Sequence, residues 1–388
     1  MLADCDAGNV VTAAQAGAQW GYRLLSVLIC LIPLLYIVQE LTVRLGIFTG
    51  RGHGELVRSH FGPRWAWLSA TGLIVAVVGS LVTEFTGIAG VGEMYGVSRA
   101  VTLPLAVVAL ISVVFLGSHR RVEKAAMLIG GFELVFFFVA WKTHPEMHEV
   151  VSQITDLQFG NSQFAYLSAA LIGATFNPWM VFYQQAVVVD RHLSEQDYPA
   201  ARLDTAVGAV LTQLLTAAVL IAVAAALAGK RYSAGFQSIG EISAALSNVA
   251  GTSVGRGLFS VGMIGASMVA AVVCSLSLAW GLGEVANYKR SLDDGPTSAP
   301  WFYVLYVVSI TASAFVVWRA PNIVSLNIVV QVVNALMLPL VTGLLIALSV
   351  KALPEARRPR GVYLWMVCGI TAAVTVVGFL GVGLNLNG

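Results

Sequence analysis

The chain has 388 residues, of which 57% are hydrophobic and only 11% are charged. Soluble domains carry roughly 25% charged residues, so this composition excludes a soluble protein that must cover its core with polar surface. It also excludes a disordered chain, which combines low hydrophobicity with high net charge. A net charge of +2 argues against nucleic-acid binding. We therefore predict an all-α integral membrane protein.

Apolar runs that are long enough to cross a bilayer, about 20 residues each, recur along the whole chain. An incomplete run at the N-terminus precedes ten full ones, so we expect about 11 transmembrane helices. The ten full runs are placed at 22–45, 66–92, 100–117, 123–141, 163–190, 203–229, 255–286, 300–318, 322–350 and 361–383.

The distribution of Lys and Arg predicts the orientation, because these residues gather in cytoplasmic loops. Of the 22, 15 fall in one set of alternate loops, with Arg44 counted at the basic end of its span, and 7 fall in the other. The first set is predicted to be cytoplasmic, which places the C-terminus and the loops 143–162 and 230–254 outside. We find no signal peptide and expect a multi-pass protein of a bacterial plasma membrane.

The incomplete first run contains a polar interruption, Asp6-Ala7-Gly8-Asn9, soon after its start. A helix broken at Gly8 needs about ten more residues to reach the cytoplasmic side. We expect that the first helix is truncated here by the choice of start site or by shortening of the sequence. The alternative is that this half-helix does not exist.

A second polar interruption, from Gly173 to Trp179, lies in the middle of the span 163–190. Pro178 lacks a backbone donor and clashes with the preceding turn, so carbonyls near Ala174 should be free at mid-depth. Unwound backbone is tolerated there only when it is buried or lines a cavity. Two interrupted helices five spans apart indicate an inverted-repeat transporter with a site at the midplane. A simple kink at Pro178 is the alternative.

The residues beside the two interruptions carry hard oxygen donors. These are the Asp6 carboxylate, the amide oxygens of Asn9 and Asn177, the Ala174 carbonyl and, from a later span, the Gln331 amide. Such donors suit Mg²⁺, Ca²⁺ or Mn²⁺ better than softer transition metals. One carboxylate among neutral oxygens fits a partly hydrated Mg²⁺ that must also leave the site.

Other polar residues within the spans have two open interpretations. Glu84 either supports the ion site or pairs with a polar group of another helix, and Gln184 either lines an exit path or bonds a neighbouring helix. Met180 would bring sulfur to the site only if the helix register were shifted. Glu40 and Arg44 are four residues apart, a spacing that favours an internal ion pair over a ligand role.

Residues that often mark enzymes or resident metal sites are not arranged for such roles. His144 and His148 lie on an outer loop with Glu146 and Glu149. Their spacing could bind a metal, but a solvated acidic loop is the simpler interpretation. There is no Walker-type phosphate loop and no catalytic constellation, so we predict neither an enzyme nor a bound cofactor. Small core residues are predicted at all four cysteines, Cys5, Cys30, Cys274 and Cys368.

Several segments resemble the NRAMP family of divalent-metal transporters, and they follow the family's order and spacing. The resemblance covers nearly the whole chain and implies the LeuT-type fold. It implies inverted repeats at 1–142 and 163–350, five segments each, followed by an extra helix at 361–383. The segments are Asp6-Ala-Gly-Asn9, the stretch from Gln15 to Gly50, Gly173-Ala-Thr175 with Pro178, Arg202-Leu-Asp204-Thr, and Gln331-Val-Val-Asn-Ala-Leu-Met-Leu-Pro339.

The departures from the family pattern narrow the expectation. The family has a Met at the position of Asn177, His at those of Trp179 and Gln184, and an acid at that of Gly87. A sulfur ligand and groups tied to proton coupling are thus missing. This combination is similar to the prokaryotic NRAMP-related magnesium transporters, which implies transport of Mg²⁺ and Mn²⁺ without evident proton coupling.

We therefore expect a divalent-cation transporter whose partners are the transported ion and the lipid bilayer. The main alternative is a proton-coupled Mn²⁺/Fe²⁺ importer. An amino-acid transporter of the same fold is opposed by Asp6, because its charge would repel a substrate carboxylate at the helix end. A membrane metal sensor that does not transport is a further alternative. The sequence predicts no oligomeric state.

Overall fold

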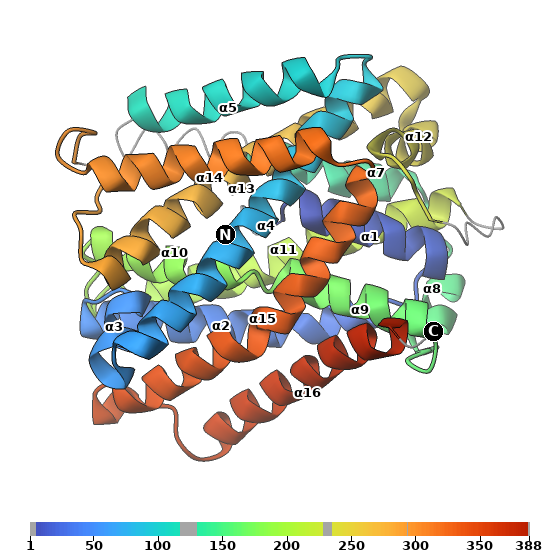
Figure 1. Cartoon of the computed structure of the whole chain (residues 1–388). Helices are drawn as coiled ribbons and strands as arrows, with labels where there is room; N and C mark the ends of the chain where they lie inside the picture. The colour runs from blue at the N-terminus through green and yellow to red at the C-terminus, as the bar shows by residue number, and fades with distance from the viewer. Residues whose placement is uncertain (1–4, 117–129, 228–234, 293, 387–388) are drawn as a thin grey trace.

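The computed structural model describes residues 5–116, 130–227, 235–292 and 294–386. Every regular element within these ranges is a helix, and the long helices run side by side across the molecule (Figure 1). The predicted all-α architecture is confirmed. Two short 3₁₀ segments, η2 and η3, accompany the α-helices.

The helices have the following bounds in chain order. They are α1 (Ala7–Trp20), α2 (Leu25–Thr49), α3 (His53–Phe61), α4 (Pro63–Met94), α5 (Arg99–Leu116), η2 (Gly131–Leu134), α7 (Val135–Lys142), α8 (Met147–Ile154), α9 (Ser162–Thr175), α10 (Pro178–Asp190), α11 (Tyr198–Ala226), α12 (Ile239–Ala250), α13 (Thr252–Ala286), α14 (Pro300–Arg319), α15 (Ile323–Lys351), η3 (Glu355–Arg357) and α16 (Gly361–Leu386).

Eight membrane spans are long and apolar enough in the described part of the chain. They correspond to α2, α4, α9 together with α10, α11, α13, α14, α15 and α16. The predicted span at 100–117 corresponds to the shorter apolar helix α5. The predicted span at 123–141 and the predicted first half-helix fall partly on residues outside the described ranges. The total of about 11 spans and the two inverted repeats remain predictions.

The predicted interruption of the span 163–190 is confirmed. Helix α9 ends at Thr175 and α10 begins at Pro178, with Phe176 at φ −111°, ψ 78° and Asn177 at φ −76°, ψ 121° between them. Pro178 takes the first position of α10, where a missing N–H breaks no helical hydrogen bond. The chain is therefore extended for two residues inside an otherwise continuous span.

Helix α1 starts beside this break. Its first helical residue, Ala7, follows Asp6, whose carboxylate accepts a hydrogen bond from the Asn9 N–H at 2.8 Å and so caps the helix. Contacts of α1 with α9, α15 and α4 bring its N-terminus into the middle of the molecule. The N-terminal end of α1 therefore lies beside the break between α9 and α10, and Gly8, where a break was predicted, lies within α1.

Helix α15 crosses the start of α1 and the end of α9 at very short range. A Cβ atom at Gly173 would lie 1.7 Å from the backbone oxygen of Gln331, and one at Gly8 would lie 1.8 Å from Gln331 Nε2. Small residues at helix contacts allow such approach in membrane proteins. These two glycines thus let the side chain of Gln331 reach the break.

A buried ion pair joins three helices at the predicted cytoplasmic end. The carboxylate of Glu40 lies 2.7 Å from Arg44 on the same helix, which confirms the predicted pair. The hydroxyl groups of Tyr198 and Tyr363 also donate to Glu40. Helix α2 is thereby connected to α11 and α16.

The short helix α3 docks on the C-terminal end of α13 on the same side. The Gly54 N–H donates to the Glu284 carboxylate at 2.7 Å, and Arg58 donates to the Val285 carbonyl at 2.9 Å. The His53 ring is fully buried and packs edge-on against Phe182 of α10, with 4.7 Å between the ring centres. Burial lowers the pKa of the His53 imidazole to about 4, although the neighbouring Gln185 opposes the shift.

We expect the stability of the protein to fall as the pH decreases from about 6.5 to about 4. In that window the unfolded chain binds a proton on His53 that the folded chain does not bind, at a cost of roughly 3 kcal/mol when complete. Thermal unfolding in detergent at a series of pH values measures this loss. The dependence of the unfolding temperature on pH should become weaker in His53→Leu. It should persist in His60→Leu, because His60 is an exposed residue of the same helix. Equal slopes in both variants would contradict the assignment to His53.

Candidate metal site

One carboxylate and one freed carbonyl are joined by two carboxamide groups at the meeting point of α1, α9 and α10. Asn9 Nδ2 donates to Asp6 Oδ1 at 3.2 Å and to the Ala174 carbonyl at 3.1 Å. Asn177 Nδ2 donates to Asp6 Oδ2 at 3.3 Å and to the same carbonyl at 3.1 Å. All four residues are at most 3% exposed. Four of the predicted ligands therefore lie together, although Asp6 and Asn9 precede Ala174 and Asn177 by 165 to 171 positions in the chain.

Gln331 joins this group from α15 through an intermediate residue. Asn334 Nδ2 donates to Gln331 Oε1 at 3.1 Å and to Asn177 Oδ1 at 2.8 Å. The Gln331 side chain also lies against Gly8, next to the Asp6 carboxylate. The structure thus gathers all five predicted ligands.

Glu84 and Trp179 flank the site, whereas Gln184 does not contact it. The Glu84 carboxylate accepts the Ala7 N–H at 3.2 Å, directly beside Asp6. The Trp179 indole donates to Ser80 Oγ at 3.1 Å. Gln184 is two helical turns farther along α10, and within the described ranges its Oε1 has no hydrogen-bond partner.

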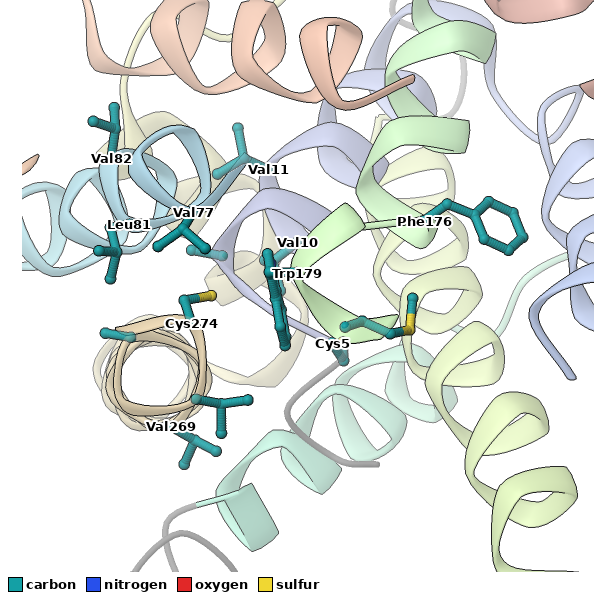
Figure 2. Packing of buried hydrophobic residues seen from close by; sticks show 14 of the residues in the cluster. Cys5, Val10, Val11, Val77, Leu81, Val82, Phe176, Trp179, Val269 and Cys274 are labelled. Carbon is teal, nitrogen blue, oxygen red and sulfur yellow. The ribbon is translucent and has the colours of Figure 1, made fainter. Parts of the chain in front are cut away.

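The hydrophobic surroundings exclude bulk water from the break. Phe176 and Trp179 point to opposite sides of it, and residues of α1, α4 and α13 complete the packing around Trp179 (Figure 2). Both aromatic side chains are at most 2% exposed. Hydrogen bonds and ion contacts are stronger in such a setting than in water.

The Met180 thioether does not face the site. Met180 Sδ accepts a hydrogen bond from Gln39 Nε2 of α2 at 3.0 Å, so its thioether is directed at another helix. Among the described residues, no group of three or more His, Cys, Asp and Glu side chains is suited to hold a metal. His144 and His148 therefore belong to no such group. The oxygen donors at the break are the candidate ligands.

The position of Gly87 is filled by the neighbouring helix. A Cβ atom there would lie 2.5 Å from Ser267 Oγ, 2.8 Å from Ala7 Cβ and 3.1 Å from Met263 Sδ. A longer acidic side chain would require α13 to move away. Gly87, where the family pattern has an acid, thus allows α4 to pack closely on α13.

Two residues that organise the site, Asn334 and Ser80, were not predicted from the sequence. Asn334 bridges Gln331 and Asn177, and Ser80 Oγ donates to Asn177 Oδ1 at 3.2 Å. A signal for Asn334 was present, because Asn327, Gln331 and Asn334 follow at intervals of four and three residues and share one face of α15. Ser80 carries no such signal, since a serine in a membrane helix commonly bonds its own backbone.

A comparison with protein families shows to which family this chain belongs. The family described as "Natural resistance-associated macrophage protein-like" (Nramp) matches residues 1–383. The chain belongs to the NRAMP family.

Curated relatives within the NRAMP family carry the name divalent metal cation transporter MntH. The protein from Klebsiella pneumoniae subsp. pneumoniae is 27% identical over 229 residues, which cover 57% of this chain and 55% of that protein. The chain therefore aligns with little more than half of that relative. The protein from Brucella suis biovar 1 is 24% identical, and the match covers 96% of this chain and 83% of the relative.

Solved structures support the fold of this NRAMP chain. A crystal structure of the Eremococcus coleocola manganese transporter has a TM-score of 0.75 at 16% identity and covers 98% of this chain and 83% of the other. Mhp1, a nucleobase-cation-symport-1 family transporter, has a TM-score of 0.60 at 15% identity and covers 99% of this chain and 89% of the other. At these identities the likeness shows the fold alone, and the predicted LeuT-type transporter fold is confirmed.

Replacing Gly173 by Ala should destabilise the protein by about 1–3 kcal/mol, because the added methyl group would overlap the backbone of α15. The same change should weaken cation binding, since it displaces Gln331 from the break. Thermal unfolding and isothermal titration with Mn²⁺ measure the two effects. Gly343→Ala on α15 is the control, since no atom lies within 4 Å of the added group. A Gly173→Ala protein as stable as this control would contradict the close crossing.

Proposed function

We propose that this protein carries divalent cations across the plasma membrane by alternating access, with Mg²⁺ as its main substrate and Mn²⁺ as a second one. The proposed ligands are Asp6, Asn9, the Ala174 carbonyl, Asn177 and Gln331. The observation that carries the proposal is their convergence where the buried start of α1 meets the break between α9 and α10, and where four hydrogen bonds of 3.1–3.3 Å connect one carboxylate and one carbonyl. In this proposal the segments 1–142 and 163–350 act as the two inverted repeats.

The chemistry of the donors supports Mg²⁺ and Mn²⁺. All five proposed ligands offer oxygen, and the sulfur of Met180 is bonded to Gln39. Hard cations prefer oxygen, and Mg²⁺ accepts one carboxylate together with neutral oxygens and retained water. The names of the relatives, divalent metal cation transporters and a manganese transporter, agree with cations of this class.

Transport without proton movement is the second part of the proposal. Moving two charges through ~100 mV provides about 4.6 kcal/mol at about 2.3 kcal/mol per charge. Because 1.4 kcal/mol is a factor of ten, this corresponds to a gradient on the order of a thousandfold. The membrane potential alone can therefore drive accumulation of a divalent cation. Trp179 and Gln184 have side chains that neither gain nor lose a proton at physiological pH.

The alternative is a proton-coupled importer of Mn²⁺ or Fe²⁺, and one observation favours it. Glu84 is a fully buried carboxylate next to Asp6, held by the Ala7 N–H and by Thr83. An acid at this position can take up or release a proton when a cation arrives. The two proposals differ in whether a metal-dependent proton flux exists.

Uptake by proteoliposomes tests both. Asp6→Ala should abolish Mg²⁺ and Mn²⁺ uptake, because it removes the carboxylate among the proposed ligands, while Glu195→Ala in an exposed loop should transport normally. A pH dye inside vesicles with a clamped potential should report no metal-dependent proton flux. Wild-type rates in a folded Asp6→Ala protein would contradict the site. A proton flux that disappears in Glu84→Gln would establish the proton-coupled alternative.

Asn177→Met should shift the preference toward softer cations, because a thioether replaces an amide oxygen. We expect Cd²⁺ and Mn²⁺ to compete more strongly against Mg²⁺ uptake than they do in the original protein. Met180→Leu is the matched control, since its sulfur faces Gln39 and should not affect selectivity. An unchanged order of preference in Asn177→Met would mean that this side chain does not touch the ion.

A further inference from the structure

Amide nitrogens, not amide oxygens, face the Asp6 carboxylate. The NH₂ groups of Asn9 and Asn177 each donate to Asp6 and to the Ala174 carbonyl. The hydrogens on these nitrogens carry positive partial charge and occupy the positions at which a cation would meet the two oxygens. The observed arrangement satisfies the carboxylate, but it cannot ligate a metal through either amide.

Binding of a cation through these amides therefore requires each carboxamide to turn by about half a rotation, which exchanges its nitrogen and oxygen. For Asn9 this is simple, because its oxygen is bonded by the hydroxyl of Thr216 at 3.4 Å. The oxygen of Asn177 is bonded by the hydroxyl of Ser80 at 3.2 Å. A hydroxyl group can donate or accept, so both contacts survive the exchange.

The contact with Asn334 does not survive by itself. Asn334 Nδ2 donates to Asn177 Oδ1 at 2.8 Å and to Gln331 Oε1 at 3.1 Å. If Asn177 alone turned, two NH₂ groups would face each other in a buried setting, which costs the desolvation of both donors. The rotation of Asn177 is thus coupled to that of Asn334.

Two buried atoms suggest how Asn334 responds. Asn334 Oδ1 and Gln331 Nε2 have no hydrogen-bond partner among the described residues, although both side chains are at most 1% exposed. If Asn177, Asn334 and Gln331 all turn, Asn334 Oδ1 accepts from the other two amides. The number of hydrogen bonds within the trio is preserved. The oxygen of Gln331 then takes the place of Nε2, beside Gly8 and Asp6.

We propose that Asn334 is a positioning residue that sets the polarity of the cation site. By donating to Asn177 and Gln331, it holds their nitrogens toward the site, and by accepting from both, it holds their oxygens toward a cation. The three carboxamides then reverse together when a cation binds. This inference rests on the proposed function, since it concerns how that site changes from a self-satisfied state to a ligating one.

Infrared spectroscopy tests the reversal directly. Protein labelled with ¹³C in the Asn side-chain carbonyls is compared with and without Mn²⁺ or Mg²⁺. The Asn334 carbonyl changes from no partner to two donors, so its stretching band should move to lower wavenumber. The band should be absent in Asn334→Leu and retained in Asn327→Leu. Asn327 is the matched control because it lies on the same face of α15, is buried and donates instead to Thr86.

Binding affinity gives a second, independent measurement. An ionised Asp only accepts hydrogen bonds, so Asn334→Asp should favour the ligating polarity and tighten Mn²⁺ binding by about tenfold. Asn327→Asp adds the same charge within about one helical turn of Gln331 and should tighten Mn²⁺ binding much less. Isothermal titration calorimetry compares the two variants and remains informative if Asn334→Leu does not fold.

The outcomes separate this inference from the proposed function. If the original protein binds neither Mg²⁺ nor Mn²⁺, the proposed function fails and the inference fails with it. If the original protein binds Mn²⁺ in an Asp6-dependent manner, but the Asn334 band is missing, the inference alone is wrong. Equal tightening by Asn334→Asp and Asn327→Asp would likewise overturn it, since charge alone would then explain the gain.

Discussion

The site depends on one constraint, the need to satisfy polar backbone groups inside a membrane. An unpaired carbonyl or N–H in hydrocarbon costs several kcal/mol, and the break between α9 and α10 exposes such groups at mid-span. Side chains meet this need. The Ala174 carbonyl accepts hydrogen bonds from two carboxamides, and the carboxylates of Asp6 and Glu84 accept hydrogen bonds from backbone N–H groups at the start of α1. The polar groups that stabilise the interruption are also those proposed to hold the cation.

Close packing makes this solution possible. Because Gly8 and Gly173 have no side chain, α15 approaches the break closely enough for Gln331 and Asn334 to join the network. The site is therefore shared by helices that are remote in sequence, and a shift of α15 would change its polar partners. A site built at such a crossing is well suited to respond when helices move against one another.

Two of the positions that depart from the family pattern, Trp179 and Gly87, are held by close packing and hydrogen bonds. Trp179 donates through its indole to Ser80, and its backbone carbonyl accepts from Ser277 of α13 at 2.8 Å. At Gly87, close contact with Ser267 and Met263 occupies the space that a side chain would need. Packing and fixed hydrogen bonds at these points join α4, α10 and α13 near the site.

The sequence by itself determined the membrane class, the positions of most spans, the interruption near Pro178 and the Glu40–Arg44 pair. These features follow from hydropathy, helix-breaking residues and a four-residue spacing, which are properties of nearby residues. It also indicated the five oxygen-bearing residues, because polar groups in apolar runs are conspicuous. The resemblance of several motifs to NRAMP transporters supplied the fold that their physical pattern alone left open.

Only the tertiary structure decided how these groups meet. That Asn334 bridges Gln331 and Asn177, that Gln184 is remote from the site, and that Met180 turns to Gln39 depend on helix rotation and crossing. The direction in which each amide points is a still finer matter. It is determined by the hydrogen-bond partners that residues far apart in the chain provide in three dimensions, and the order of residues along one helix does not encode it.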